Sequence, residues 1–186
     1  MQFWSTVHAN GASNQQIAMF ILNSPEHRAS IIQGFYQTYL HRGLDPAGLN
    51  YWLRVMAMGA TDEQVLGAIV GSNEYYVTNG GTSDSFVRAM YRDVLHRTTP
   101  PSQPEIDYWI ATLAASTRGA TQARADVVVG FATSDEFRAA EINGWYQAYL
   151  GRPASAAEIN NWLLFFHLGN TTEAVQAQIL LGRSGM

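Results

Sequence analysis

The residues of this chain that could bind a ligand lie in short aromatic segments that occur three times. Tyr51 and Trp52 follow Asn50, and Tyr108 and Trp109 follow an aspartate. An aromatic ring can stack on the apolar C–H face of a sugar, while nearby amide, carboxylate and guanidinium groups bind the sugar's hydroxyls. This chemistry points to carbohydrate binding, and the candidate residues are Arg42, Asn50, Tyr51, Trp52, Arg97, Asp107, Tyr108, Trp109, Arg152, Asn161 and Trp162.

The same aromatic residues also have a purely structural interpretation. Trp52, Trp109 and Trp162 fall in apolar stripes at helical spacing, where core packing is the commoner role. Tyr51 and Tyr108 lie one step around the helix, beside polar residues, so we expect them to be partly exposed. A glycan site would place these tyrosines on the floor of a shallow groove with polar groups around it. An assembly surface would bury them or present flat apolar patches.

Recognisable motifs for covalent or metal chemistry are missing from the sequence. The chain has no Cys, no G-x-S-x-G motif, and no H-E-x-x-H motif among its five histidines. Glu26, Glu74 and Glu136 recur at helix starts, which helix capping explains better than a glycosidase pair does. His41 and His96 each precede a recurrent arginine, where a helix C-terminus is expected. We therefore predict no enzymatic activity, no metal site and no cofactor.

Composition and charge argue against two further classes of partner. Of 186 residues, 47% are hydrophobic, which is enough to bury a core. The formal net charge is −4 and the eleven basic residues are all scattered arginines, so we expect no nucleic-acid surface. No run reaches the roughly 18 apolar residues of a membrane-spanning helix. A signal peptide is not recognisable at the N-terminus, and we expect an excerpt from a longer protein.

The candidate residues belong to an internal repeat. Tyr36, Tyr91 and Tyr146 are 55 residues apart. Around each tyrosine, apolar residues recur at positions i, i+3, i+4, i+7 and i+8, which predicts an amphipathic helix. A second helix carries the tryptophan, and a third follows it. The fold class is therefore all-α, with tandem degenerate repeats of about 50–55 residues, three to four helices each, packed as a helical array or bundle.

Capping residues mark where these helices begin and end. Asp45, Ser102 and Ser155 are N-caps of the tryptophan helices, and a glutamate three residues after each serine completes a capping box. A Ser-x-Glu signal at Ser72 and Ser134 is expected to cap a final short helix. The glycines expected to end the second helices are Gly59, Gly119 and Gly169, and the N-caps expected for the third helices are Thr61, Thr121 and Thr171.

These signals divide the chain into half a repeat and three whole ones. Residues 1–30 are the second half of a repeat, and whole repeats cover residues 31–78, 86–138 and 139–186, with a possible linker at residues 78–85. Together the repeats are expected to form one or two compact helical domains. The residues that mark the two chain ends are Phe3 and Trp4, which match Tyr51 and Trp52, and Ser184, which matches Ser134.

The stretch from Tyr36 to Tyr75 reads Y-x3-L-x-R-x2-D-x2-G-L-x-Y-W, then a Gly-Ala-Thr turn, then S-x-E-Y. This pattern resembles a bacterial repeat family catalogued as a domain of unknown function, found in secreted and cell-surface proteins beside RTX-type calcium repeats and S-layer modules. It is more distantly similar to the helical linker domain of phycobilisomes. The later copies depart from the pattern, with Ser102 in place of Asp and Asn161 in place of Tyr. The resemblance implies a helical interaction module at the bacterial cell surface and implies no reaction.

We therefore predict a non-catalytic carbohydrate-binding or adhesion module of a secreted bacterial surface protein. Its expected partners are a glycan or polysaccharide and the other domains of a longer parent chain. The alternative is a structural or protein–protein assembly repeat that binds no small ligand. An enzyme of unknown type is a minor alternative.

Overall fold

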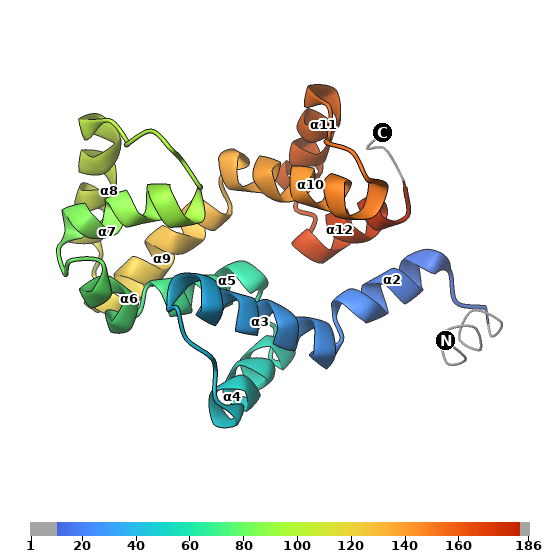
Figure 1. Ribbon diagram of the computed structural model, residues 1–186, viewed down its shortest axis with the longest axis horizontal. Helices are drawn as coiled ribbons and strands as arrows, with labels where there is room; N and C mark the ends of the chain where they lie inside the picture. The colour runs from blue at the N-terminus through green and yellow to red at the C-terminus, as the bar shows by residue number, and fades with distance from the viewer. Residues whose placement is uncertain (1–10, 183–186) are drawn as a thin grey trace. The chain divides into compact units, whose positions relative to one another are not determined.

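The computed structural model describes residues 11–182, which form helices and no strand, so the predicted all-α fold is confirmed for this part of the chain (Figure 1). Phe3, Trp4 and Ser184 lie outside the described residues. A short π-helical segment, η1, continues α7. The elements are α2 (Asn14–Leu22), α3 (Pro25–Tyr39), α4 (Pro46–Ala57), α5 (Asp62–Val70), α6 (Asn73–Thr78), α7 (Ser83–Ala89), η1 (Met90–Val94), α8 (Gln103–Ala115), α9 (Ala120–Ala132), α10 (Asp135–Leu150), α11 (Ala156–His167) and α12 (Thr172–Leu180).

The chain divides into two compact units. One unit is Ala29–Phe137, and the other joins the described part of Met1–Arg28 to that of Arg138–Met186. Both unit boundaries fall inside a continuous helix, α3 or α10, as do the repeat boundaries placed after residues 30 and 138. The reason is local: a helix capped by serine runs directly into the next tyrosine helix. The prediction of a short helix after Ser134 is therefore wrong, because α10 has 16 residues. The short helix predicted after Ser72 is confirmed, since α6 has 6 residues.

In the Ala29–Phe137 unit, α5 and α9 pack closely along each other. They are the third helices of successive repeats. A Cβ atom on Gly67 would lie 2.7 Å from Cγ2 of Val129, and one on Gly71 would lie 2.5 Å from the backbone nitrogen of Ala125. Glycine is thus what lets the two backbones approach. Side chains buried around this pair, contributed by α6, α7, η1, α8 and α9, include Tyr75, Phe86, Met90, Ile106 and Phe131.

The other unit repeats this arrangement with different residues. Helices α10, α11 and α12 enclose a core of Ile142, Tyr146, Trp162, Phe166, Val175 and Ile179. Helix α2 packs on α12 through Ala18, Leu22 and Ala177. Since α2 and α12 occupy the same place in their repeats as α5 and α9, the third helices pair in both units.

Most of the predicted helix ends are confirmed. Asp45 accepts the N–H of Gly48 at the start of α4, and Thr61 and Ser155 form capping boxes with Gln64 and Glu158. Thr171 and Ser72 cap α12 and α6. Gly59 and Gly169 take positive φ angles of 103° and 87° directly after α4 and α11, where a left-handed residue lets the chain turn away.

The middle repeat differs from the expectation at one helix junction. Helix α8 ends at Ala115 because Ser116 takes an extended conformation, so Gly119 does not close that helix. Gly119 instead stands at the N-cap of α9 with a φ angle of −55°, and Thr121 lies inside α9. The predictions for Gly119 and Thr121 are therefore wrong. Between α6 and α7 only residues 79–82 are non-helical, which is half of the stretch predicted as a linker.

We predict that Gly71→Ala destabilises the protein by about 1–3 kcal/mol, because the new methyl group meets the backbone of Ala125 and α5 must move away from α9. Gly34→Ala is the matched control. Gly34 lies inside α3 with nothing within 4 Å of its Cβ position, so this change should stabilise by about 0.5–1 kcal/mol. Urea unfolding measures both, and equal effects would contradict the close-approach argument.

Candidate ligand-binding surface

A hydrogen bond between tryptophan and tyrosine joins the first two helices of every repeat. The indole Nε1–H of Trp52 donates to the hydroxyl of Tyr36 at 3.0 Å. The equivalent distances are 3.1 Å from Trp109 to Tyr91 and 2.9 Å from Trp162 to Tyr146. Trp162 is 1% exposed, whereas Trp52 and Trp109 are half-buried. Each tryptophan therefore joins two helices of its repeat, and Trp52 and Trp109 are partly open to solvent.

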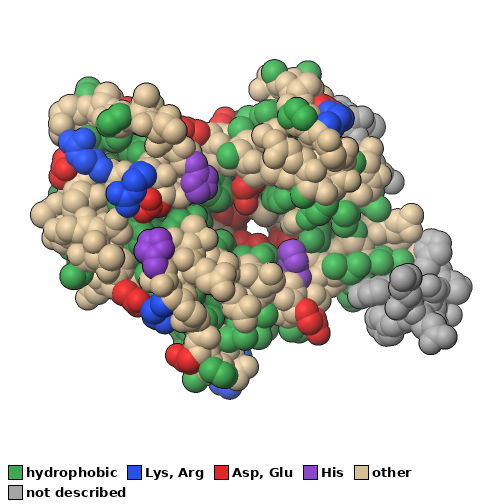
Figure 2. Space-filling model, in the orientation of Figure 1, with side chains coloured by type: hydrophobic (Ala, Val, Ile, Leu, Met, Phe, Trp, Pro, Cys, Tyr) green, Lys and Arg blue, Asp and Glu red, His purple; other side chains and the backbone are tan. Residues whose placement is uncertain are grey.

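The recurrent arginines are also engaged inside the fold. The guanidinium groups of Arg42, Arg97 and Arg152 lie over the rings of Tyr36, Tyr91 and Tyr146, at 4.9, 4.6 and 5.0 Å from the ring centres. Each guanidinium is also bonded through two nitrogens to one carboxylate. The partners are Glu74 for Arg42, Glu136 for Arg97 and Glu158 for Arg152. Figure 2 shows acidic and basic side chains close together at several places on the face that it draws.

Hydrogen bonds hold the pKa values of several carboxylates below their ordinary range. The bond from Arg152, and then the backbone N–H of Ser155, lowers the pKa of Glu158 to about 2. Ser102 first and Arg97 second lower the pKa of Glu105 to about 2. These carboxylates are ionised at neutral pH, so they carry no proton that a general acid could donate.

Tyr51 and Tyr108 stand outside this internal network. They are 59% and 64% exposed, and each meets the neighbouring tryptophan edge-on with ring centres 5.0 Å apart. Asn50 and Asp107 beside them are also exposed, and Asp107 accepts a hydrogen bond from Gln103. In the third repeat the equivalent position is Asn161, which is half-buried. The expected exposure of the two tyrosines is thus observed.

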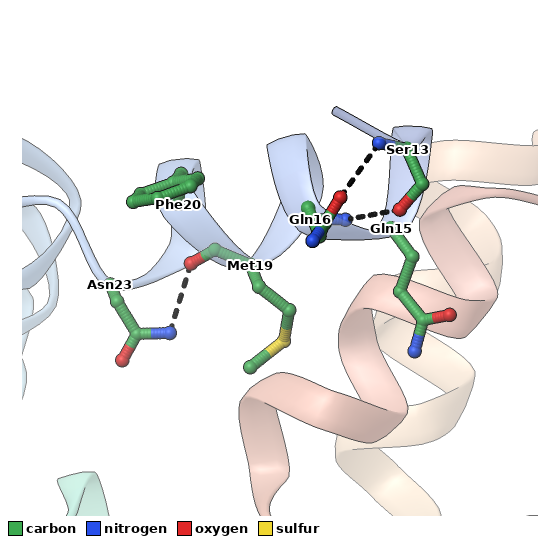
Figure 3. A pocket seen from close by; sticks show the side chains of 6 residues that line it. All are labelled: Ser13, Gln15, Gln16, Met19, Phe20 and Asn23. Atoms are coloured by element: carbon green, nitrogen blue, oxygen red, sulfur yellow. Dashed lines mark hydrogen bonds between the residues drawn. The ribbon is translucent and has the colours of Figure 1, made fainter. Parts of the chain in front are cut away.

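The described hollows of the surface lie away from these tyrosines. The largest, about 710 Å³, runs along α2 and is lined by Ser13, Gln15, Gln16, Met19, Phe20 and Asn23 (Figure 3). Figure 3 shows that Asn23 turns back to its own helix, bonding the carbonyl of Met19, while Ser13 and Gln16 bond each other in a capping box. Two smaller hollows, of about 380 and 210 Å³, lie against α9. Tyr51 and Tyr108 line none of the three.

Arg124 is a buried charged residue that was not identified from the sequence. Its side chain is 6% exposed and lines the smallest of these hollows. A signal was present, because Arg124 shares one face of α9 with Val127, Val128 and Phe131 at the spacing i, i+3, i+4 and i+7. A charged residue on an apolar stripe is buried with partners or marks a site.

Within the described residues, no cluster of three or more His, Asp or Glu side chains is arranged to hold a metal ion. None of the helices between residues 11 and 182 has both the length and the apolar character to cross a bilayer.

Comparison with protein families identifies most of the repeat array. A family model described as "Domain of unknown function (DUF4214)" matches residues 28–79 and, in an adjacent second copy, residues 76–141. The two copies meet at the connection between α6 and α7, and they include α5 and α9. The comparisons with curated proteins and with solved structures each gave no match.

We predict that Tyr146→Phe destabilises the protein by about 1–3 kcal/mol, because it leaves the indole N–H of Trp162 buried without an acceptor. Tyr36→Phe makes the same change where the tryptophan is half-buried, and there water can replace the hydroxyl, so the loss should stay below about 1 kcal/mol. Denaturant unfolding of both variants checks this. Losses of equal size would show that burial does not set the strength of the bond.

We predict that the pKa of the Glu158 carboxyl group is about 2 in the folded protein, against 4.5 in the unfolded chain. Because the folded pKa is the lower one, this group stabilises the fold fully above pH 4.5, and the stabilisation is lost as the pH falls towards 2. NMR titration of side-chain carboxyl carbons measures the pKa. In Arg152→Gln it should rise towards 4.5, and an unchanged value would disprove the role of the arginine.

Proposed function

Because the chain belongs to the DUF4214 family, whose description assigns no function, we propose from the geometry that it is a non-catalytic carbohydrate-binding module of a secreted or cell-surface bacterial protein. Its contact residues are Tyr51 and Tyr108, flanked by Asn50 and Asp107. The observation that carries the proposal is the recurrence of a tyrosine that the fold does not bury. Tryptophan, arginine and glutamate recur with partners inside the repeat, whereas these two rings recur at equivalent, exposed positions.

The tryptophan behind each tyrosine supports a binding role. An edge-on contact at 5.0 Å limits the orientations of the exposed ring, and Trp109 is itself fixed by its bond to Tyr91. A ring held in this way loses little conformational entropy when a ligand stacks on it. Asn50 and Asp107 supply an amide and a carboxylate next to the rings for sugar hydroxyls.

The high exposure of the two tyrosines, which line none of the three hollows described above, indicates the kind of glycan. A single sugar on an open helix surface would bury only one face and would bind weakly, because small ligands usually need a concave site. A long polysaccharide can contact several exposed rings at once, and each further contact adds to the avidity. The proposed ligand is therefore an extended polysaccharide rather than a free mono- or disaccharide.

Carboxylates of the array fit a binding role better than hydrolysis. Glu74, Glu105 and Glu158 have lowered pKa values because arginine or serine donates hydrogen bonds to them. A glycosidase needs one carboxyl group that stays protonated near neutral pH.

A second candidate function is protein–protein assembly, and one observation favours it. Met58 is 80% exposed at the end of α4, and Leu168, the same distance after its tryptophan, is 71% exposed beside α11, with Leu164 one turn earlier also exposed. Large apolar side chains on one helix face are typical of protein contacts. These exposed apolar residues are distinct from the proposed glycan contacts: Met58 follows α4, which carries Tyr51, and Leu164 and Leu168 belong to the third repeat.

We predict that the double variant Tyr51→Ala, Tyr108→Ala loses at least tenfold in affinity for a polysaccharide that binds the parent chain, equivalent to about 1.4 kcal/mol. The test is a polysaccharide array followed by affinity electrophoresis, with the matching disaccharides as competitors. Both tyrosines are exposed, so circular dichroism and thermal unfolding should match the parent.

The control is Met58→Ala, Leu168→Ala, which removes two exposed side chains of similar size and should bind polysaccharide like the parent. No binding by the parent across the array would reject the proposal. Concentration-dependent dimerisation that disappears in this control variant would establish the assembly function instead.

A further inference from the structure

The hollow of about 210 Å³ in the Ala29–Phe137 unit combines an apolar wall with a buried charged side chain. It lies among α6, α7, α8 and α9. Ile110 and Ala123 contribute apolar wall, and Tyr76 and Arg124 contribute the polar part. Ala114 lines it too and is exposed, so the hollow is reached from solvent on that side.

Arg124 is buried without an acidic partner. Its Nε donates to the carbonyl oxygen of Gly71 at 2.9 Å, and its Nη2 donates to the side-chain oxygens of Asn73 and Thr121. The guanidinium lies 4.3 Å from the centre of the Tyr76 ring. All these partners are neutral, and none of these bonds uses Nη1.

Six of the other arginines between residues 11 and 182 contrast with Arg124. Those with a carboxylate partner are Arg42, Arg88, Arg92, Arg97, Arg118 and Arg152. Between residues 11 and 182, no ion pair is formed by Arg124, and a guanidinium stays protonated at neutral pH even when buried. The carbonyl end of α5 at Gly71 offers only a partial negative charge. The hollow is therefore bordered by a buried positive charge that the protein does not neutralise.

We propose that this hollow binds a small monocarboxylic acid with an apolar body. The carboxylate accepts hydrogen bonds from Nη1 of Arg124 and from the hydroxyl of Ser83, which also lines the hollow, and the apolar body packs on Ile110. One cation matches one monoanion, whereas a phosphate dianion would leave excess negative charge against an apolar wall. The volume is below the range usual for drug-sized ligands, so it fits a body about as large as a single ring.

Arg124 also holds the junction between α5 and α6, because Gly71 is the C-cap of α5 and Asn73 is the first residue of α6. A substitution of Arg124 would disturb this junction whether or not a ligand binds. The test is therefore made from the rim. Ala114→Trp fills the hollow from an exposed position, and Ala115→Trp places the same side chain on the neighbouring exposed residue, which does not line the hollow.

The experiment is a titration of the 186-residue chain with benzoate, benzamide and inorganic phosphate. Binding is measured by calorimetry and by the NMR chemical shifts of the α8 and α9 amides. We expect saturable binding of benzoate, with no binding of neutral benzamide or of phosphate. Ala114→Trp should weaken benzoate binding at least tenfold, and Ala115→Trp should bind like the parent. Equal binding of benzamide, or full binding by Ala114→Trp, would overturn the proposal.

An N-acetylated dipeptide with a free C-terminus separates two sources of the carboxylate. Weaker binding than benzoate supports a free small acid, and tighter binding would overturn that choice in favour of a peptide terminus. The double variant Tyr51→Ala, Tyr108→Ala should bind benzoate like the parent, so this site and the proposed glycan contacts succeed or fail separately.

Discussion

The rest of each repeat depends on the contacts of one tyrosine near the end of its first helix. Tyr91 accepts the indole N–H of Trp109, carries the guanidinium of Arg97 on its ring, and accepts the backbone N–H of Arg97 at its carbonyl. The arginine then binds Glu136 at the start of α10. Three helices are thus fixed to one residue, and two of these bonds join parts of the chain far apart in sequence, so local helix propensity alone could not place them.

The copies meet the same geometric demand with different residues. After the first helix the chain must take a left-handed turn, and the residue there is His41, His96 or Gly151, with φ angles of 53°, 53° and 67°. Glycine adopts this conformation without strain, whereas a histidine in it is uncommon. The carboxylate partner of the arginine also changes, from Glu74 to Glu158. The repeat requires a left-handed turn after the first helix and a carboxylate beside the arginine. More than one residue can meet each requirement, so the sequences of the copies can differ while the fold of the repeat is kept.

The contacts within each repeat distinguish the residues that hold the fold together from those that remain available to bind a ligand. Once the tyrosine, tryptophan, arginine and glutamate of each repeat are engaged, Tyr51 and Tyr108 remain outside, and Arg124 remains inside without an anion. The two tyrosines suit contact with an extended ligand on the surface, whereas Arg124 suits a small ligand in a hollow. They lie in the same unit but in opposite physical situations. The tyrosine rings are exposed and have water to displace, whereas Arg124 is a buried charge whose hydrogen-bond partners are all neutral.

The sequence by itself determined the helical class, the repeat, most helix caps and the exposure of Tyr51 and Tyr108, because these follow from periodicity and from hydrogen bonds within a few residues. It placed the end of α8 wrongly, since Gly119 offered a left-handed turn that Ser116 made unnecessary. Only the tertiary structure decided that α5 pairs with α9 and that Arg124 donates its hydrogen bonds to the junction between α5 and α6. Those outcomes depend on which helix faces meet across dozens of residues, and local spacing carries no information about that.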